Sequence, residues 1–486
     1  MQIREHNQKE SKQKENKRII TVMVALCSLL ISLVLYISYF QVFKSETIKQ
    51  NSHNKRLWMN EENVLRGSIL DRNGEVLSYS KKENDQNIRY YPYGRLYSHV
   101  IGYSYRQYGK AGLEKQYNNE LLDINENNAI DEIKNLVLPK SIGNNLKLTI
   151  DHNMQQKTRS LLKGKKGSII TMNPSTGEIY SMVSLPDFDS SNLDSQWAGI
   201  IESKDSPLLN RSIQGLYAPG SIYKVITTVA ILETYGIDKN YICDGKATVD
   251  GFTTNDYGNY SHGSIDLNGA FKNSCNPYFV EKSLLVGKEK LGEVAEKFMI
   301  NQQIPFDLEV KKSKFEYKDS MGKTKLVASA IGQGDVLVTP LNMAMMASAV
   351  ANDGEMVKPI LVKEVINKNG KIIRTNLTET LSYTSKSSIA EEVKTMMREV
   401  VSSGTGTNAS IKNVKVSGKT GTAENASGKS HSWFIGFAPH DKPKLAVAVV
   451  LEEEGSTGGK AAAPIARDLI IYGLNNIKFE EEIVND

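Results

Sequence analysis

An uninterrupted run of uncharged residues at positions 19–40 constrains this chain more than any other feature of its sequence. As a helix, a run of this length rises roughly 33 Å, about the thickness of the hydrocarbon layer of a membrane. Lysine and arginine outnumber acidic residues in the segment before it, and positive charge stays on the cytoplasmic side. We therefore expect a cytoplasmic tail at 1–18, a membrane anchor at 19–40, and the rest of the chain outside the plasma membrane.

A cleaved signal peptide is the alternative to an anchor. The apolar region of a signal peptide has about 7–15 residues and ends at a small-x-small cleavage site. The run at 19–40 is longer and has no such site. No later segment reaches about eighteen uninterrupted apolar residues, so we expect a single-pass protein.

Length, charge and cysteine content exclude several classes. A chain of 486 residues exceeds one ordinary core, so two or more folded units are expected. The net charge of +5 is spread without a dense basic block, which argues against nucleic-acid binding. Cys27 lies in the apolar run, and Cys243 and Cys275 stand outside any CxxC or Cys/His motif. We therefore expect no metal site, while a Cys243–Cys275 disulfide stays an open alternative.

The exported part changes character near residue 143. Residues 41–143 are polar and irregular, with a hairpin expected around the Asn-Gly turn of Arg66–Gly74, and nothing in them suggests catalysis. After Asn144, strand patterns enclose helical ones, which predicts an α/β fold whose antiparallel sheet is completed by the last strands and a terminal helix. The predicted strands are 146–150, 167–172, 178–184, 432–438 and 445–451, and the predicted helices are 221–236, 265–286, 288–299, 340–352, 388–403 and 461–474.

The tetrapeptide Ser221-Ile222-Tyr223-Lys224 has the residue types of a serine acyl-transfer site. Pro219-Gly220 precedes it and apolar residues follow at helical spacing, which places the serine in the first turn of a buried helix. There its backbone N–H can point at a developing oxyanion, and a desolvated lysine one turn on can act as its base. The pattern alone is weak, because it also begins at Ser11, Ser160 and Ser320.

Two further motifs follow in order, Ser274-Cys275-Asn276 and Lys419-Thr420-Gly421-Thr422. The serine hydroxyl of the first can pass a proton between a lysine and a leaving amine, and its asparagine can orient Lys224 or hold a substrate amide. In the second, the lysine supplies positive charge for a substrate carboxylate. The glycine is expected to leave a strand edge uncovered for a substrate backbone, and the threonine after it to offer its hydroxyl and its N–H.

In combination these motifs resemble those of penicillin-binding transpeptidase domains. Gly332-Gln333-Gly334 and Trp433–Pro439 extend the resemblance, and Arg66–Gly74 with Gly112-Leu113-Glu114 resembles the pedestal of the class B, monofunctional branch. The implied fold is α/β (α+β) and serine β-lactamase-like, an antiparallel sheet with helices on both faces and a helical subdomain. The implied domains are a pedestal at 41–143, a transpeptidase domain at 144–478 and an acidic tail at 479–486.

The resemblance also implies roles and partners. Ser221 is the implied nucleophile, Lys224 its base, Ser274 and Asn276 the second catalytic element, and Lys419 to Thr422 the strand that binds the stem-peptide terminus. The serine attacks D-Ala-D-Ala, and an amine from a neighbouring stem peptide resolves the acyl-enzyme. β-Lactam antibiotics acylate the same serine, and no cofactor or metal is needed. The implied protein partner is a multi-spanning glycan polymerase of the shape, elongation, division or sporulation type.

Three rival functions fit the sequence less well. A bifunctional class A protein needs a glycosyltransferase domain, for which residues 41–143 are too few. A class A β-lactamase needs a deacylating glutamate in the sequence Glu-x-x-Leu-Asn, and the nearest candidate, Glu309, does not fit because Val310-Lys311-Lys312 follows it. Tyr257-Gly258-Asn259 is similar to a motif of class D β-lactamases, but it precedes Ser274 and is interpreted as a turn. A β-lactam sensor would carry further spans and a His-Glu-x-x-His segment, and a scaffold would not need the lysines. The acceptor amine and the choice between elongation, division and sporulation stay open.

Overall fold

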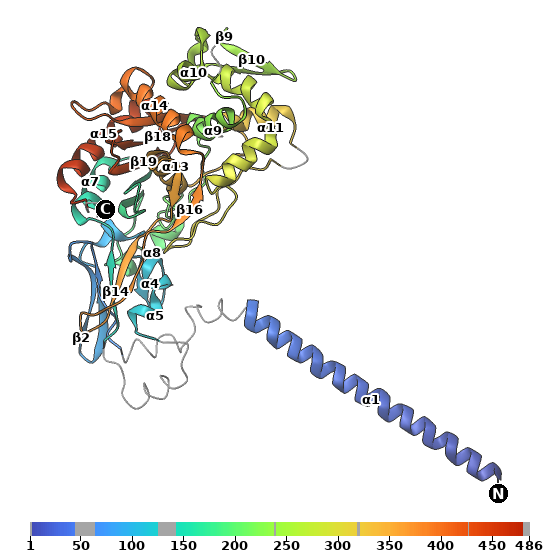
Figure 1. Ribbon diagram of the computed structural model, residues 1–486. Helices are drawn as coiled ribbons and strands as arrows, with labels where there is room; N and C mark the ends of the chain where they lie inside the picture. Colours follow the sequence, from blue (N-terminus) through green and yellow to red (C-terminus); the bar gives the residue numbers. More distant parts are fainter. Residues whose placement is uncertain are drawn as a thin grey trace, which may run out of the picture. The chain divides into compact units, whose positions relative to one another are not determined.

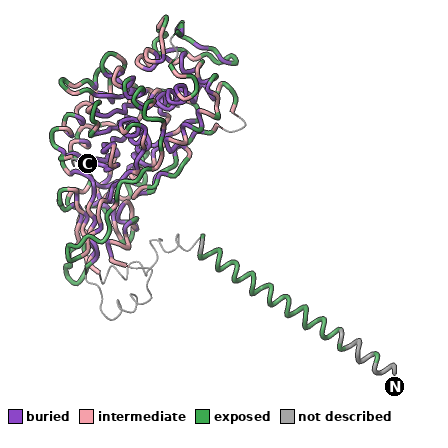
Figure 2. The backbone as a smooth tube through the Cα atoms, in the orientation of Figure 1, coloured by how far each residue is buried: buried purple, intermediate pink, exposed green. Residues whose placement is uncertain are grey.

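The computed structural model describes residues 2–43, 64–124, 142–237, 240–317, 321–425 and 427–479, so residues 480–486 of the predicted acidic tail lie outside the described residues. The chain falls into two compact units, and the smaller one contains the helix α1 (Gln2–Phe43). The stretch Lys14–Gln41 of α1 is long and apolar enough to cross a membrane. Its side chains are exposed along the helix (Figure 2), which suits a lipid environment better than water.

Strands from distant parts of the sequence form a six-stranded sheet in the larger unit (Figure 1). Its central strand β6 pairs parallel with β1 and antiparallel with β14, so that Leu146 lies between Ile69 and Val365. The order is β15 (Ile372–Thr375), β14 (Val362–Ile366), β6 (Asn145–Leu148), β1 (Ile69–Leu70), β2 (Val76–Glu83) and β3 (Gln86–Tyr90).

The hairpin predicted around Arg66–Gly74 is confirmed. Strands β1 and β2 pair antiparallel, and the turn between them is closed by the carboxylate of Asp71, whose Oδ1 accepts from the backbone N–H groups of Asn73 and Glu75 at 2.8 Å. An aspartate that bonds the backbone ahead of it stabilises a tight turn. The short helices α4 (Gly112–Gln116) and α5 (Asn118–Leu121) lie in the same part of the chain.

A buried carboxylate ties this sheet to α4. Glu114 is fully buried and forms ion pairs with Arg66 and Arg89, the latter at 2.7 Å from Nε to Oε1. Burial opposes ionisation, but the two guanidinium groups outweigh it and lower the pKa of Glu114. The sequence pattern gave no sign of this cluster, because its members lie on three separate elements.

A second sheet of five antiparallel strands forms the centre of the larger unit. All five predicted strands of residues 144–478 are present, and the one at 146–150 belongs to the first sheet. Asp151 caps the next helix, with its Oδ1 accepting from Met154 N at 2.9 Å. The order is β17 (Ser417–Ala423), β18 (His431–Ala438), β19 (Leu445–Leu451), β7 (Gly167–Met172) and β8 (Ile179–Leu185).

Helices cover both faces of this sheet. The odd-numbered residues of β19 from Leu445 to Leu451 pack into a buried cluster with α7 (His152–Leu162) and α15 (Gly458–Asn476). The even-numbered residues between them are also buried, and α13 (Pro340–Ala351) contacts β19, β18 and β7. Because neighbouring strand residues face opposite sides, this pattern requires a helix layer on each face. Figure 2 shows the resulting buried centre.

A helical region lies beside β17, the edge strand of this sheet (Figure 1). Its helix α9 packs against α11 and α14, and a turn of 3-10 helix, η2, packs against β17. A small strand pair, β9 with β12, lies over α10 and α11. The bounds are η2 (Gly220–Tyr223), α9 (Lys224–Thr234), β9 (Tyr241–Cys243), β10 (Lys246–Val249), β11 (Phe252–Asn255), η3 (Tyr257–Asn259), β12 (Gly263–Ile265), α10 (Leu267–Asn273), α11 (Asn276–Lys297), α12 (Lys323–Ala330) and α14 (Ser387–Ser403).

The remaining short elements connect these layers. They include η1 (Gly94–Tyr97), α8 (Leu193–Glu202), η4 (Thr407–Ala409) and the antiparallel pair β13 (Glu355–Val357) with β16 (Thr380–Tyr383). The interpretation of Tyr257-Gly258-Asn259 as a turn is confirmed, because it forms η3 with Gly258 at a φ of 71°.

Candidate active site

Ser221 lies on the 3-10 turn η2 immediately before α9, so the expected α-helical start is wrong by one turn. Gly220 has a φ of 56°, and a Cβ there would lie 2.5 Å from the carbonyl oxygen of Thr422 on β17. The N–H of Gly220 donates to the carbonyl oxygen of Gly332 at 2.8 Å. Glycine is required because no other residue allows both this backbone conformation and this close approach, which together place Ser221 beside β17.

Lys224 is the first residue of α9, and its side chain is fully buried. Its Nζ donates to the carbonyl oxygen of Ser274 at 2.6 Å and to Oδ1 of Asn276 at 2.7 Å. The ring of Phe279 lies 5.2 Å from the same nitrogen. Burial lowers the pKa of Lys224 to about 8, although the negative charge of Asp256 opposes that shift. A substantial neutral fraction near physiological pH follows.

Ser274 and Asn276 lie in a break between two helices, where the sequence pattern predicts one continuous helix at 265–286. That prediction is wrong because Ser274 has a φ of 62°, a left-handed conformation that ends α10, and α11 begins at Asn276 followed by Pro277. Apolar residues keep helical spacing on both sides of Ser274, so the hydrophobic periodicity of the sequence does not reveal the break between α10 and α11. The break turns both polar side chains toward Lys224.

Lys419 approaches the same serine from the strand side. It is fully buried on β17, and its Nζ donates to Oγ of Ser274 at 3.0 Å and to the carbonyl oxygen of Thr420 at 3.3 Å. The Nζ of Lys224 lies 3.3 Å from the same hydroxyl. Burial lowers the pKa of Lys419 well below its usual value, and the positive charge of Lys224 lowers it further.

Gly421, in the motif Lys419–Thr422, faces the turn that carries Ser221. A Cβ on Gly421 would lie 2.8 Å from the carbonyl oxygen of Pro219 and 3.1 Å from the Cβ of Trp433. The expectation that Gly421 keeps the strand edge uncovered is therefore corrected: its missing side chain makes room for the turn before Ser221 and for β18. Nε1 of Trp433 donates to Ala218 O at 3.0 Å and fixes the same turn.

Both threonines of the motif have partners. The hydroxyl of Thr420 lies 2.6 Å from that of Thr405, in the loop after α14, and the hydroxyl of Thr422 accepts from Gly458 N at 3.3 Å. Sequence reasoning missed Thr405, since it lies in no recognisable motif. It singled out Gly332 only as part of a family pattern, whereas the structure shows that residue holding Gly220.

Cys243 and Cys275 are brought into one cluster with His262, so the expectation that they belong to no Cys/His group is wrong. Strands β9 and β12 pair with Cys243 opposite Gly263, which places His262 next to that cysteine. Sγ of Cys275 lies 3.4 Å from Sγ of Cys243, and both cysteines are free thiols. The cluster escaped notice because its members are separated by a strand pair and a helix.

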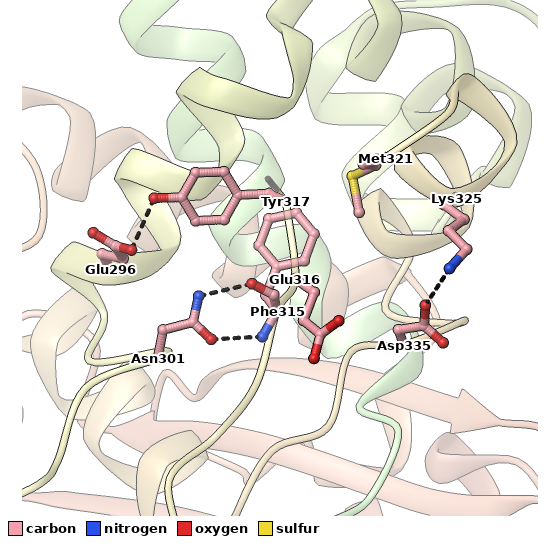
Figure 3. Close-up of a pocket in the computed structure, with 8 residues that line it drawn as sticks. All are labelled: Glu296, Asn301, Phe315, Glu316, Tyr317, Met321, Lys325 and Asp335. Atoms are coloured by element: carbon pink, nitrogen blue, oxygen red, sulfur yellow. Dashed lines mark hydrogen bonds and ion pairs between the residues drawn. The ribbon is translucent and has the colours of Figure 1, made fainter. Parts of the chain in front are cut away.

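A cavity of about 410 Å³ lies near α12, and none of its lining residues belongs to the three motifs (Figure 3). Its polar groups pair with one another: Tyr317 donates to Glu296 at 2.8 Å, and Lys325 lies 3.0 Å from Asp335. Figure 3 shows these pairs on opposite walls. We assign it no role in the chemistry.

A serine on a tight turn, a buried lysine and a serine hydroxyl between two lysines, set beside an antiparallel sheet, define the penicillin-recognising serine enzymes as a class. Residues 167–470 match the model of the penicillin binding protein transpeptidase domain, and residues 66–145 match that of the penicillin binding protein A dimerisation domain. The chain belongs to the penicillin-binding protein family, in its class B branch.

Relatives of known name support this placement. The chain is 31% identical to the peptidoglycan D,D-transpeptidase PbpA of Mycolicibacterium smegmatis, over 94% of this chain and 99% of the relative. It is 31% identical to stage V sporulation protein D of Bacillus subtilis, over 79% of this chain and 64% of the relative. The ceftriaxone acyl-enzyme of penicillin-binding protein A from M. tuberculosis superposes with a TM-score of 0.79 at 28% identity, covering 86% of this chain and all of that one.

Proposed function

We propose that this chain is a membrane-anchored D,D-transpeptidase that cross-links peptidoglycan stem peptides through an acyl-enzyme on Ser221. One observation carries the proposal: Oγ of Ser274 lies within hydrogen-bond distance of two buried lysines, Lys224 and Lys419. Buried lysines are costly to keep charged, so a pair of them around one hydroxyl is explained by proton transfer rather than by stability.

In the first step, Lys224 acts as the base. A neutral lysine has two N–H groups and one lone pair, and its two shortest hydrogen bonds go to Ser274 O and Asn276 Oδ1. The lone pair is left for the proton of Ser221 Oγ as that oxygen attacks the carbonyl carbon of the penultimate D-Ala. Asn276 is held in turn by Nδ2 donating to Asn255 O at 3.1 Å.

The leaving group then needs a proton. As the C–N bond breaks, the hydroxyl of Ser274 gives its proton to the amine of the departing D-Ala and is reprotonated by a neighbouring lysine. An amine of a second stem peptide attacks the ester, its proton returns along the same path, and Ser221 leaves with its hydroxyl restored. β-Lactams enter the first step in the same way.

The substrate terminus lies along β17. This strand is at the edge of the five-stranded sheet, so its backbone groups on one side are open to an added extended segment. Lys419 supplies positive charge for the terminal carboxylate, and Thr420 and Thr422 supply hydroxyls beside it. Gly421 acts indirectly, by letting β17 lie against the serine turn.

The anchor and the domain division complete the proposal. Residues 1–18 are the cytoplasmic tail, 19–40 the span, 41–143 the pedestal and 144–478 the catalytic domain, with residues 479–486 as a tail. The basic residues before the span favour a cytoplasmic N-terminus. A multi-spanning glycan polymerase is the proposed partner, because a monofunctional transpeptidase needs nascent glycan strands as substrate.

A labelling experiment tests the proposal. The full chain in detergent is incubated with fluorescent penicillin, next to Ser221→Ala and to Ser160→Ala, which removes the serine of another Ser-x-x-Lys sequence on α7. We expect labelling to be lost in the first variant and kept in the second. Labelling that survives Ser221→Ala would overturn the assignment. A stem-peptide donor with and without an amine acceptor then distinguishes transfer from hydrolysis by the product formed.

A further inference from the structure

Four side chains of the helical region converge on one point beside the proposed active site. One ligand atom each from Cys243, Asp256, His262 and Cys275 lies within 4.8 Å of all the others. They come from the end of β9, the segment after β11, the segment before β12 and the break between α10 and α11. Such convergence of two thiols, an imidazole and a carboxylate from separate elements is typical of metal centres.

The spacing suits a small tetrahedral ion. Around zinc, two thiolate sulfurs lie roughly 3.8 Å apart, and a sulfur and a nitrogen roughly 3.5 Å apart. Here Sγ of Cys243 lies 3.4 Å from Sγ of Cys275 and 3.6 Å from Nδ1 of His262. Oδ2 of Asp256 lies 2.9 Å from the same Nδ1. Little movement is needed for all four atoms to contact one ion.

Asp256 gives an independent sign of a ligand. Its Oδ1 accepts from the N–H groups of Tyr257 at 3.0 Å and Asn276 at 3.2 Å. Its Oδ2 is buried, and apart from the ion-pair contact with Nδ1 of His262 it receives no hydrogen bond among the described residues. The side chain is 3% exposed, and a buried carboxylate oxygen is costly to leave without a donor or a cation. One carboxylate oxygen of Asp256 lies within 4.8 Å of each of the other three ligand atoms.

We propose that Cys243, Asp256, His262 and Cys275 bind one zinc ion that holds the Ser-x-Asn motif in place. Two thiols select zinc over magnesium or calcium, and four protein ligands leave no open position, so the ion is structural. The cysteines are fully buried, whereas the side chain of His262 is 19% exposed.

The position of Cys275 gives the site its consequence. It is the middle residue of Ser274-Cys275-Asn276, whose neighbours on both sides accept hydrogen bonds from Lys224. A metal bond to Cys275, together with the contact from Asp256 to Asn276 N, fixes the left-handed turn at Ser274. The ion is therefore a positioning element for the lysine. This consequence rests on the proposed function, whereas zinc binding itself does not.

The test measures metal in the full chain. Protein purified in detergent and dialysed is analysed for zinc, and the stripped protein is reconstituted with cobalt, which absorbs strongly in the visible when bound by thiolates in a tetrahedral site. Cys243→Ala and His262→Ala remove ligands, and Cys27→Ala removes a thiol in α1 as the matched control. We expect one zinc per chain and the cobalt spectrum in wild type and Cys27→Ala, and at least a tenfold lower affinity in the other two.

The outcomes separate this proposal from the proposed function. Equal zinc content in wild type and Cys243→Ala, or a stripped wild-type chain that gives no cobalt spectrum, would overturn the site. So would metal-free protein whose mass has lost two hydrogen atoms, which shows a Cys243–Cys275 disulfide instead. The cobalt experiment on the wild-type chain tests the site even if the ligand variants fail to fold. Fluorescent penicillin is used in parallel: stripping zinc is expected to slow labelling, whereas labelling unaffected by Ser221→Ala contradicts the enzyme assignment alone.

Discussion

Lys419 Nζ donates to Ser274 Oγ at 3.0 Å across 145 positions of sequence, and this contact joins a strand edge to the break between two helices. Because Lys224 Nζ lies 3.3 Å from the same oxygen, one hydroxyl connects the two buried amines. Burial lowers the pKa of both amines, and the positive charge of Lys224 lowers the pKa of Lys419 further.

Removing that hydroxyl should impair chemistry more than folding. For Ser274→Ala we expect acylation by penicillin to slow by about 100-fold or more, the usual effect of losing a proton-transfer group. The second-order rate of labelling measures this, and the thermal midpoint, expected to change little, shows that the fold is intact. An acylation rate equal to that of wild type would mean that Ser274 takes no part in proton transfer.

The lowered pKa of Lys224 predicts a pH dependence. The neutral amine is the base, and its pKa is lowered to about 8, so the acylation rate should rise as pH increases through that value and level off above it. Lys224→Arg, which keeps the charge but stays protonated, should be inactive at every pH tested. A wild-type rate that is flat across this range would rule out Lys224 as the group that must lose its proton.

Gly421→Ala tests the close approach of β17 to the serine turn. The added Cβ would lie 2.8 Å from Pro219 O, so the turn must shift and acylation should slow at least tenfold. Gly199→Ala, in α8 with nothing within 4 Å of the added atom, is the matched control and should leave acylation unchanged. If both variants label as fast as wild type, the approach of turn and strand does not set the reaction geometry.

The buried Glu114 should matter for stability and not for the chemistry. Glu114→Gln leaves two buried guanidinium groups without their counter-charge, and we expect about 3–5 kcal/mol less free energy of unfolding. Denaturant unfolding measures it, with Glu202→Gln at an exposed position of α8 as the control. A loss below about 1 kcal/mol would show that the arginines find other partners or water.

Four strands of the central sheet, β7, β8, β18 and β19, were predictable because each is short, apolar and bounded by turn residues. The fifth, β17, has the sequence SGKTGTA, which lacks an apolar pattern, and it was expected only from the family resemblance. Helix α13 followed from an apolar run after Pro340. The break at Ser274 was not predictable in the same way, since a left-handed residue leaves no trace in hydrophobic spacing. The 3-10 form of the turn at Ser221 was missed for a similar reason: it depends on the close approach of Gly220 to Thr422, about two hundred positions later.

For the site, the order of the three motifs predicted a common active site, and the structure brings side chains from each motif, Lys224, Ser274 with Asn276, and Lys419, into contact. The role of Ser221 stays a prediction. Their supports came only from the fold, because Thr405, Asp256 and His262 belong to no motif. Gly421 is the clearest example of what the sequence does not reveal. The sequence pattern identified the residue, but a glycine is needed there because β17 packs closely against Pro219, and no local pattern predicts that contact.

The pairing of β6 with β14 has a consequence for how such proteins can be recombined. The sheet that contains β1, β2 and β3 also takes strands from residues 362–375, far inside the catalytic part of the chain. Exchanging only the N-terminal segment with that of a relative would set foreign strands beside a native β14 and β15. We therefore expect functional chimeras to require both segments together, and gene fusions that divide the chain once near residue 143 to yield insoluble protein.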